Sequence, residues 1–433
     1  MSKLPKLSTA IDHIPSCNLD ALRIDDAQQL MQAFVENFHI SLGMEVIGLQ
    51  QALGRVLAKD LISPIDVPIA DNSAMDGYAF NSAALKDSTS STISLKQIGT
   101  ALAGKPFLGN IPISSCVRIM TGAIMPSGCD TTIPQELVRV DGEQISFSDT
   151  TIKPGDNRRL RGEDLFKGQP AILAGKIIRP ADLGLIASLG IPQIEVYKKL
   201  RVGFLSTGTE IRSLGQALDP GSIYDSNRYT IFGMLSRLGV EVVDFGVLAD
   251  DPIKLRNAFH EVAASCDAVI TSGGVSVGEV DYTKQIMQEM GDIGFWKLAI
   301  RPGRPMAFGS INTDNHQCVL FGLPGNPVAT MVTFYQLVQP TLLRMAGASV
   351  RTPPVTKARL SHIIRKSLGR TEFQRGTLSI GADGMSIVTA LPSQGSGVLS
   401  SMSQADCLII LGNEQATAEA GDLVDVLVFE GLI

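Results

Sequence analysis

The chain has 433 residues, of which 44% are hydrophobic and 18% charged, and its formal net charge is −6. This composition is typical of a globular protein of about three domains, and the negative charge argues against a dedicated nucleic-acid-binding protein. No apolar run is long enough to span a membrane, and the first 17 residues lack the apolar core of a signal peptide. Six scattered cysteines without a C-x-x-C motif predict reduced thiols and a cytoplasmic location.

The first part of the chain combines a helical pattern with a β-rich insert. Apolar residues recur at helical spacing over 26–40, which predicts an amphipathic helix. Residues 61–149 are short strand-like pieces separated by Gly, Pro, Ser and Asp, whereas residues 150–197 return to a strand, a turn and a helix. We therefore predict a discontinuous mixed α/β domain, formed by 1–60 and 150–197, that is interrupted by a β-rich insert domain.

The second half of the chain changes rhythm twice. Residues 198–348 alternate strand and helix patterns, which predicts a doubly wound, mostly parallel sheet with helices on both faces. Residues 349–433 revert to short strands and turns, which predict a small barrel or sandwich, and we expect a C-terminal β barrel. The predicted fold class is therefore multidomain α/β, with a central α/β sheet domain between β-rich parts.

Three polar, Gly-bearing loops follow strands of the predicted sheet. They read STGTE (206–210), SGGVSVGEVD (272–281) and LPGNP (323–327). Ligands bind beyond the carboxyl ends of parallel strands, and glycine lets main-chain N–H groups approach a phosphate closely. We therefore predict an anion-binding site at this edge, and its candidate residues are Ser206, Gly208, Gly273, Gly274, Ser276 and Asn326.

Charged residues accompany these loops. Glu210 and Asp281 would lie beside the bound phosphate, and hard carboxylates next to phosphate are what Mg²⁺ requires. The segment RPGRP (301–305) holds Arg301 and Arg304 on a Pro-Gly turn, where two guanidinium groups suit an oxyanion. The sequence thus predicts a magnesium site and an oxyanion site near the same sheet edge.

Two further motifs resemble nucleotide-binding or hydrolase signatures. GTALAGKP (99–106) has P-loop spacing, but Pro106 replaces the magnesium-binding hydroxyl and no long helix follows, so we reject it. GVSVG (274–278) matches the nucleophile elbow of serine hydrolases with Ser276 at its centre. A serine hydrolase therefore remains an alternative, and it would need His316 or His362 as its base.

The ordered motifs DNSAMDGYA, TGAIMP, RGED, STGTE, TSGGVSVGEVDYTK, RPGRPMAFG and GLPGNPV cover nearly the whole chain. In this order they resemble the MoeA family of molybdopterin molybdenumtransferases, whose eukaryotic relatives include the gephyrin E domain. The resemblance implies insertion of molybdate into adenylylated molybdopterin, with Mg²⁺-dependent release of AMP, during molybdenum cofactor biosynthesis. It also implies a homodimer whose active cleft combines the sheet domain of one subunit with the β insert of the other. A non-catalytic scaffold is the other alternative, because gephyrin relatives also cluster membrane receptors.

The resemblance also implies roles for individual residues. Glu210 and Asp281 match the magnesium-associated acids of the family. The nucleotide side matches Ser206, Gly208, Gly273 and Gly274, the insert side matches Asp76, Thr121 and Asp164 as catalytic residues, and the molybdate and pterin-phosphate region matches Ser276, Arg301 and Arg304. A further partner implied is the adenylyltransferase that supplies the substrate.

The chain departs from the family pattern at two places. Arg301 and Arg304 replace the lysines of the usual KPGKP, which keeps the charge but adds bulk. Ala329 replaces the serine that usually follows GNPV, so a hydroxyl contact to molybdate is either lost or moved to Thr330.

Overall fold

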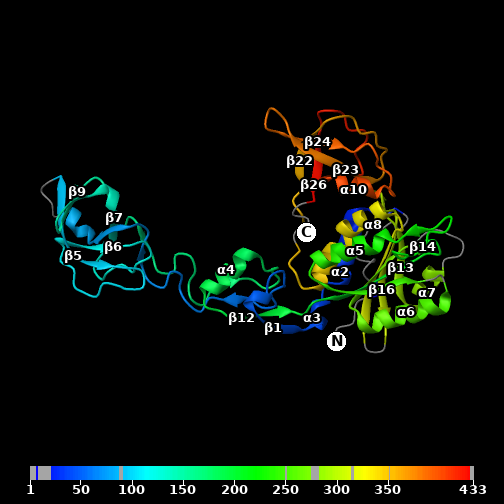
Figure 1. Cartoon of the computed structure of the whole chain (residues 1–433), viewed down its shortest axis with the longest axis horizontal. Coiled ribbons are helices and arrows are strands. Elements are labelled where there is room, and N and C mark those ends of the chain that lie inside the picture. Colours follow the sequence, from blue (N-terminus) through cyan, green and yellow to red (C-terminus); the bar gives the residue numbers. More distant parts are fainter. Residues whose placement is uncertain are drawn as a thin grey trace. The chain divides into compact units, whose positions relative to one another are not determined.

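The computed structural model describes residues 6–7, 21–86, 91–248, 251–274, 282–313, 316–350 and 352–429. The chain forms two compact units (Figure 1). The larger unit comprises Met1–Ala58, Gly175–Pro180 and Gln193–Ile433, and the smaller comprises Lys59–Ala174 and Ala181–Pro192. The finer division into four domains stays a prediction.

A six-stranded sheet forms the centre of the larger unit. Its order is β16-β13-β17-β21-β20-β18, in which the first four strands are parallel and the last two run antiparallel to their neighbours. The strands are β13 (Arg201–Thr207), β16 (Glu241–Leu248), β17 (Ala268–Ser272), β18 (Gly291–Lys297), β20 (Pro305–Asn312) and β21 (Gln317–Leu323). This arrangement confirms the predicted mostly parallel sheet and adds an antiparallel edge that the sequence analysis did not predict.

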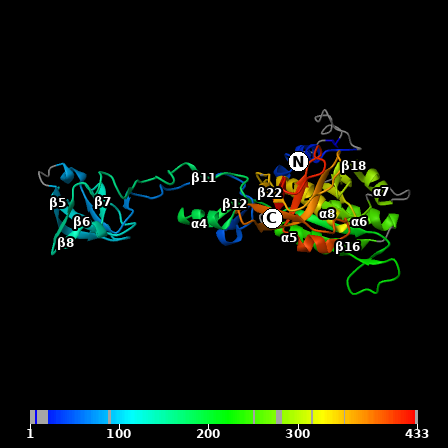
Figure 2. The same cartoon turned by 90° about the horizontal axis from the view of Figure 1, so that it is seen from above.

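Helices cover both faces of this sheet (Figure 2). Successive strand residues point to opposite faces, so Phe204 packs under one helical layer and Leu205 under the other. One layer contains α2 (Ile24–Phe34), α5 (Ser226–Arg237), α8 (Pro327–Thr333), the π-helical turn η4 (Phe334–Val338) and α9 (Gln339–Met345). The other contains α6 (Pro252–Ser265) and α7 (Tyr282–Met290). The three-layer α/β architecture expected from the alternating pattern is thus confirmed.

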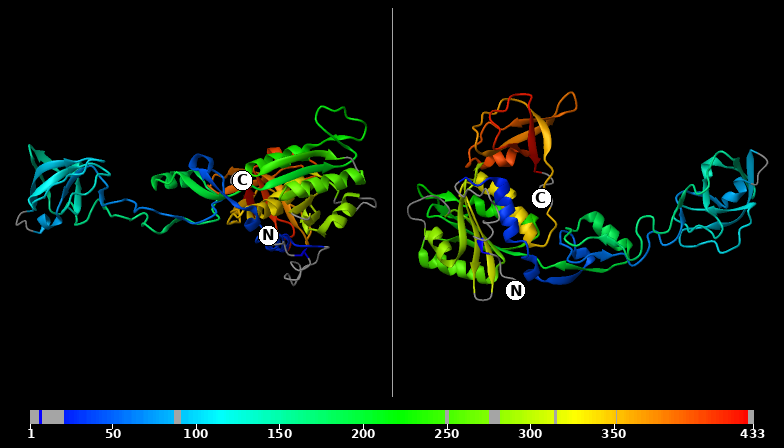
Figure 3. Two further views of the ribbon diagram at one scale, coloured as in Figure 1. Left: turned by 90° about the horizontal axis from the view of Figure 1, so that it is seen from below. Right: turned by 180° about the vertical axis from the view of Figure 1, so that it is seen from behind.

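The N-terminal helical pattern forms two helices. The predicted helix over 26–40 divides into α2 and a short α3 (His39–Leu42). The apolar face of α2 is buried, and the Phe34 ring packs edge-on against Phe308 of β20 at 5.2 Å between centroids. Helix α2 also lies beside α9 (Figure 3). The amphipathic pattern therefore reflects packing against the central sheet.

The strand that follows α3 pairs with a strand from beyond the insert. Strand β1 (Met44–Gly48) precedes the short 3-10 helix η1 (Leu49–Gln51). It pairs antiparallel with β12 (Gln193–Tyr197), so the chain returns to the larger unit where the insert ends.

The C-terminal region is a closed β barrel. Strand β23 pairs with both β24 and β25, and the remaining pairings complete a five-strand circuit. The strands are β22 (Thr356–Leu360), β23 (Thr371–Ile380), β24 (Ser386–Ala390), β25 (Cys407–Leu411) and β26 (Leu423–Val428), and α10 (Leu399–Gln404) lies between two of them. Closure pairs the strand edges and confirms the predicted barrel. Strand β19 (Ile300–Arg301) joins the barrel by pairing with β23.

The smaller unit is β-rich, as predicted. Its main sheet has the order β7-β4-β6-β5-β9-β8. Those strands are β4 (Gly77–Phe80), β5 (Thr92–Ala101), β6 (Ser115–Ile119), β7 (Thr131–Pro134), β8 (Arg139–Asp141) and β9 (Gln144–Ser148). Four further strands, two 3-10 helices and one helix complete it: β2 (Leu61–Ile62), β3 (Asn72–Ser73), β10 (Arg158–Arg159), β11 (Pro170–Ile172), η2 (Ser82–Leu85), η3 (Gln135–Leu137) and α4 (Pro180–Ser188). The rejected P-loop motif forms a tight turn in which Leu102 faces Lys105.

The cysteines in the described ranges are free thiols. Cys116, Cys129, Cys266, Cys318 and Cys407 are buried and carry free thiols. Burial raises the pKa of Cys116, Cys129 and Cys407 to about 12, so these thiols are protonated at neutral pH. No helix in the described ranges is long and apolar enough to cross a membrane.

Candidate active site

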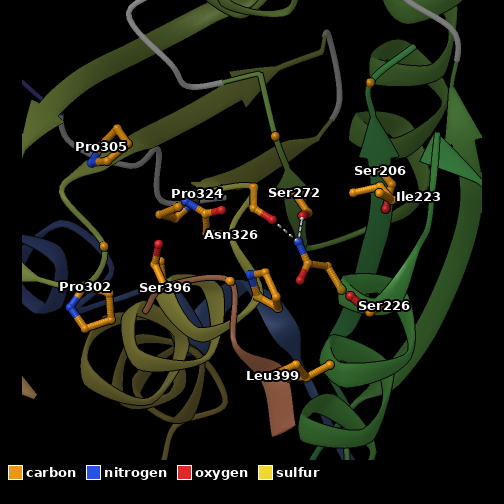
Figure 4. Close-up of a pocket in the computed structure, with 18 of the residues that line it drawn as sticks. Ser206, Ile223, Ser226, Ser272, Pro302, Pro305, Pro324, Asn326, Ser396 and Leu399 are labelled. Atoms are coloured by element: carbon orange, nitrogen blue, oxygen red, sulfur yellow. Dashed lines mark hydrogen bonds between the residues drawn. The ribbon is translucent and has the colours of Figure 1, made fainter. Parts of the chain in front are cut away.

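A pocket of about 1250 Å³ lies at the carboxyl edge of the central sheet (Figure 4). Strands β13, β17 and β21 end level with one another, because Ser206 is paired with Ser272 and Ser272 with Leu323. The three predicted loops therefore meet around one space, which the barrel closes from the other side. We call it the carboxyl-edge pocket, and its predicted lining residues are Ser206, Gly208, Glu210, Gly273, Gly274, Arg301, Arg304 and Asn326.

Asn227 ties the floor of this pocket together. It lies in the first turn of α5, and its Nδ2 donates to Ser272 Oγ at 2.6 Å and to the Gly325 carbonyl at 2.7 Å. Because one amide group holds two different loops, the ends of β17 and β21 are fixed relative to α5. Asp225, the N-cap residue of α5, accepts from the N–H of Arg228 and holds the start of this helix.

The floor also carries buried polar atoms that lack partners. Within the described part of the chain, Ser206 Oγ, Thr207 Oγ1, Asp225 Oδ2 and Asn227 Oδ1 make no hydrogen bond. Buried polar atoms are nearly always paired in folded proteins, and unpaired ones gather where a ligand or ordered water completes them. The floor is therefore built for a polar ligand.

The adjacent glycines after β17 adopt a backbone that other residues rarely take. Gly273 has φ +90° and Gly274 has φ +68°. A Cβ atom on Gly273 would lie 2.7 Å from the Thr207 carbonyl oxygen, so a larger residue would press against the end of β13. The pair thus lets two strand ends approach closely, whereas the predicted approach of its N–H groups to a phosphate stays a prediction.

Three arginines also line the pocket. Arg301 and Arg304 come from the turn between β19 and β20, and Arg370 comes from the barrel. Arg301 forms an ion pair with Glu372 of β23, with Nη1 3.6 Å from Oε1. For Arg304, no ion pair is found in the described ranges, so its charge is the more available one for an anionic ligand.

Two of the predicted site residues cannot be placed, and four residues that line the pocket were not predicted. Ser276 and Asp281 lie outside the described residues, so their predicted roles stay predictions. Asn227, Asp225, Arg370 and Ser396 line the pocket but were missed. The sequence DSN at the start of α5 was a signal for the first two, since Asp is a strong N-cap residue and the helix follows the first loop.

At position 329, where the family usually has serine, the pocket is lined by an alanine without a hydroxyl group. Ala329 lines the pocket, whereas Thr330 is fully buried and donates its hydroxyl to the Pro324 carbonyl at 2.6 Å. Thr330 therefore closes the loop that precedes α8. Its hydroxyl is not on the pocket surface, so the expected transfer of the molybdate contact to this residue finds no support in the geometry.

The smaller unit brings two of its predicted residues together. Gly77 of β4 is paired with Ile119 of β6, so the start of one strand lies beside the end of the other. As a result, Asp76 Oδ1 accepts from the Thr121 N–H at 2.7 Å and from its hydroxyl at 2.8 Å. These two hydrogen bonds hold the pKa of the Asp76 carboxyl below its ordinary value. Asp76 is therefore a carboxylate fixed in place but open to solvent.

A network of acids and arginines lies in the same unit. Asp71 accepts from the Arg161 N–H at 2.7 Å and from Arg158 Nε at 2.8 Å, while Asp66 forms an ion pair with Arg161. The N–H of Arg161, and less strongly Arg158, keep the pKa of Asp71 lowered. The DNSAMDG and RGED motifs are thus tied together. Asp164 of RGED donates its N–H to the Val67 carbonyl, and its side chain is exposed.

The structure does not support either candidate base of the serine hydrolase alternative. His316 precedes β21 and lies 3.7 Å from Asp267, which precedes β17. Both residues are at the amino ends of their strands, whereas the Ser276 segment follows the carboxyl end of β17. His362 lies on the barrel beside Ser361. Neither histidine lines the carboxyl-edge pocket.

Comparison with protein families agrees with this site. The "MoeA N-terminal region (domain I and II)" matches residues 22–190, the "Probable molybdopterin binding domain" matches 203–344, and the "MoeA C-terminal region (domain IV)" matches 357–429. The chain belongs to the MoeA family. The recognition made from the ordered motifs is confirmed, and the second family match contains the three loops of the carboxyl-edge pocket.

Individual relatives are similar over most of their length. A molybdopterin molybdenumtransferase of Haemophilus influenzae is 41% identical over 95% of this chain and 100% of its own. One from Nostoc is 35% identical over 89% and 88%. A molybdopterin biosynthesis MoeA protein from Pyrococcus horikoshii OT3 has a similar structure, with a TM-score of 0.77 and 25% identity over 99% of this chain and 100% of that one. The predicted enzyme class, a transferase, and a role in molybdenum cofactor biosynthesis are confirmed by these relatives.

Proposed function

We propose that this transferase inserts molybdate into adenylylated molybdopterin and releases AMP, which yields molybdenum cofactor. The observation that carries the proposal is the carboxyl-edge pocket itself, where three Gly-bearing loops and three arginines surround unpaired polar atoms. A ligand with phosphates and a polar heterocycle matches both halves of that lining. The names of the relatives supply the molybdopterin and molybdenum.

We assign the glycine side of the pocket to the adenylyl phosphate. Ser206 lies near the end of β13 and Gly208 follows it, Gly273 and Gly274 follow β17, and Asn326 precedes α8. Small side chains there leave main-chain groups open to phosphate oxygens. Ser276, which follows the same glycines in sequence, is assigned to the pterin phosphate and molybdate.

The arginine side is assigned to the oxyanion. Arg301, Arg304 and Arg370 present guanidinium groups to the pocket, and these charges offset the negative charge of molybdate and of the pterin phosphate. The reaction joins two anions, so binding and charge neutralisation at fixed positions are the main contributions of this chain.

Magnesium would be held by Glu210. Its exposed carboxylate lines the pocket, and its Oε2 lies near Gly208, where a Cβ would approach it to 2.8 Å. An oxygen donor beside a phosphate cradle fits Mg²⁺, which needs only one or two carboxylates when substrate phosphates supply the rest. Asp281 is the second ligand we propose. Bound magnesium would neutralise charge on the phosphate oxygens.

We propose that the protein acts as a homodimer in the cytoplasm. Large apolar side chains are exposed along one stretch of the larger unit, including Leu214, Leu218 and Ile223. Tyr229 and Phe232 of α5 are also about half exposed and stand one helical turn apart. Exposed apolar groups of this kind mark protein interfaces, and a second copy of this chain is the partner we propose. The adenylyltransferase that makes the substrate would be a transient partner.

Activity with defined substrates tests the function. Purified protein is incubated with adenylylated molybdopterin, molybdate and Mg²⁺, and AMP is measured by chromatography. We expect AMP release that requires both molybdate and Mg²⁺, and an Asp281→Ala variant that folds but releases none. AMP release that is independent of molybdate would contradict the proposed transfer. A fully active Asp281→Ala protein would contradict the magnesium assignment alone.

A further inference from the structure

Arg375 is a buried arginine in the C-terminal barrel. It lies on β23, and only 1% of its surface is exposed. Burial lowers its pKa to about 10, so it still carries its charge at neutral pH. No ion pair involving Arg375 is found among the described residues. A buried charge without a carboxylate is costly, so its hydrogen bonds must compensate for the lost water.

Those hydrogen bonds go to the segment that follows β24 and to α10. Arg375 Nη2 donates to the carbonyls of Ser393 and Gly395, each at 3.1 Å, and its Nε donates to Ser401 Oγ at 3.0 Å. The main chain of Arg375 also exchanges hydrogen bonds with the side chain of Gln394, at 2.9 and 2.8 Å. A single residue therefore holds both ends of the segment between β24 and α10. We call residues 393–397 the barrel loop.

The barrel loop forms one wall of the carboxyl-edge pocket. Gln394, Gly395, Ser396 and Gly397 all line it. On its other side, the Ser396 carbonyl accepts from the N–H of Val328 at 3.0 Å. Val328 is in the first turn of α8, where helix N–H groups lack partners within the helix. The loop is thus held between a buried guanidinium and the start of the helix that follows the LPGNP loop.

We propose that Arg375 is a positioning residue that fixes the barrel loop against α8 and so sets where Ser396 meets the ligand. The planar, forked guanidinium suits this task, because it reaches two carbonyls and a hydroxyl at once in a fixed geometry. A lysine would keep the charge but offer a single point of contact. The loop's role at the ligand rests on the proposed function, whereas its attachment to Arg375 does not.

Hydrogen exchange of the free protein tests the attachment directly. In Arg375→Lys and Arg375→Met proteins, we expect the amides of Val328 and of residues 398–401 to exchange about tenfold faster or more, since several hydrogen bonds to the loop are lost. Amides of β25 and β26 should keep their protection, which shows that the barrel is folded. The matched control is Arg359→Lys, which alters an exposed pair with Asp383 on the same barrel. Ser401→Ala removes the Nε acceptor and also the hydrogen bond from the Ser401 hydroxyl to the Val398 carbonyl, but it keeps both bonds from Nη2. It should give a smaller acceleration and serves if the Arg375 variants fail to fold.

Activity then separates the inference from the proposed function. We expect Arg375→Lys to raise the KM for the adenylylated substrate in AMP release more than it lowers kcat, because the wall of the binding site has moved. Unchanged exchange at Val328 in folded Arg375 variants would overturn the positioning role. So would faster exchange combined with parental KM and kcat. A parent protein that releases no AMP would overturn the proposed function, and the exchange data would still decide the attachment.

Discussion

Arg301 and Glu372 form an ion pair between the arginine turn and the barrel. Arg301 Nη1 lies 3.6 Å from Glu372 Oε1, and the same two residues are paired where β19 lies alongside β23. The Glu372 side chain is 9% exposed and that of Arg301 is 68% exposed. Arg301 thus shares its charge with a nearly buried carboxylate, whereas Arg304, which follows Gly303 on the same turn, has no such partner among the described residues. The two arginines are therefore not equivalent.

Arg304 should contribute more to oxyanion binding than Arg301. A charge-assisted hydrogen bond contributes roughly 1.5–3 kcal/mol, and exposure reduces that value, so we expect Arg304→Ala to raise the molybdate concentration for half-maximal AMP release about tenfold. Arg301→Ala should raise it less. Arg304→Lys should recover much of the loss, because lysine keeps the charge. The measurement is a molybdate titration of AMP release for the parent and three variants.

The titration also has a clear negative outcome. An Arg304→Ala curve that superimposes on the parent curve would show that the turn is an ordinary solvated one. A larger effect for Arg301→Ala than for Arg304→Ala would mean that the Glu372 pair does not weaken the action of Arg301 on the ligand.

Gly273 should tolerate no side chain. With φ +90° and a would-be Cβ only 2.7 Å from the Thr207 carbonyl oxygen, Gly273→Ala combines backbone strain with a clash against main chain. We expect a loss of about 1–3 kcal/mol in the free energy of unfolding, measured as a lower Tm by calorimetry. Gly325→Ala is the matched control in the neighbouring loop, since its Cβ would meet nothing closer than Gly273 Cα at 3.9 Å. Equal Tm values for both variants would refute the strain argument.

The hydroxyl of Thr121 should influence the titration of Asp76. Two hydrogen bonds lower the pKa of Asp76: the larger effect comes from the Thr121 N–H and the smaller from the Thr121 hydroxyl. A depressed native pKa gives stability that is present above the ordinary value near 3.8 and is lost as the pH falls through the native pKa. Thr121→Val keeps the N–H bond and removes the hydroxyl, so the Asp76 pKa should rise toward 3.8 without reaching it.

Carboxyl-carbon NMR titration measures this change. Thr121→Ser is the control, because it keeps the hydroxyl and should retain the parental Asp76 titration. In Thr121→Val, protonation of Asp76 should begin at a higher pH than in the parent. Identical curves for Thr121→Val and the parent would show that the main-chain N–H alone sets this pKa.

The sheet-edge part of the site was predictable because the rule behind it is local. A buried strand followed by a Gly-bearing loop places that loop at the carboxyl edge, and parallel strands end together. The meeting of Ser206, Gly273 and Asn326 around one pocket can therefore be predicted without any knowledge of long-range packing. By contrast, Asp76 and Thr121 are 45 residues apart and meet only because β4 and β6 pair in one register. That register could not be read from either segment alone.

The antiparallel edge of the central sheet and the barrel loop could not be predicted from the sequence, for different reasons. Strands β18 and β20 contain Gly291 and Gly309, which weaken the strand pattern. A Cβ on Gly291 would lie 2.1 Å, and one on Gly309 2.0 Å, from a carbonyl oxygen of the facing strand. Close pairing of the two strands therefore requires glycine at both positions. The barrel loop reads as an ordinary Gly-Ser turn, and only the packing of Arg375 and Val328 on either side shows that it forms a pocket wall.

The last prediction concerns sharing of the active site between subunits. Asp76 belongs to the smaller unit, while Arg304, Glu210 and the Gly273 loop belong to the larger one. Family resemblance implies that one cleft uses the insert of one subunit and the sheet of another. Asp76→Ala and Asp281→Ala proteins should each be inactive alone. In a mixed dimer, one of the two clefts would contain both intact residues.

Subunit mixing therefore distinguishes a shared site from one within a single chain. After subunit exchange, the mixture of Asp76→Ala and Asp281→Ala should recover about a quarter of the parental AMP release, because half of the dimers are mixed and each has one intact cleft of two. Exchange is verified by mass spectrometry of differently tagged chains. The matched control is Asp76→Ala mixed with Thr121→Ala, which alter the same side of the cleft. If mixed dimers form and release no AMP, Asp76 and Asp281 do not act from different subunits.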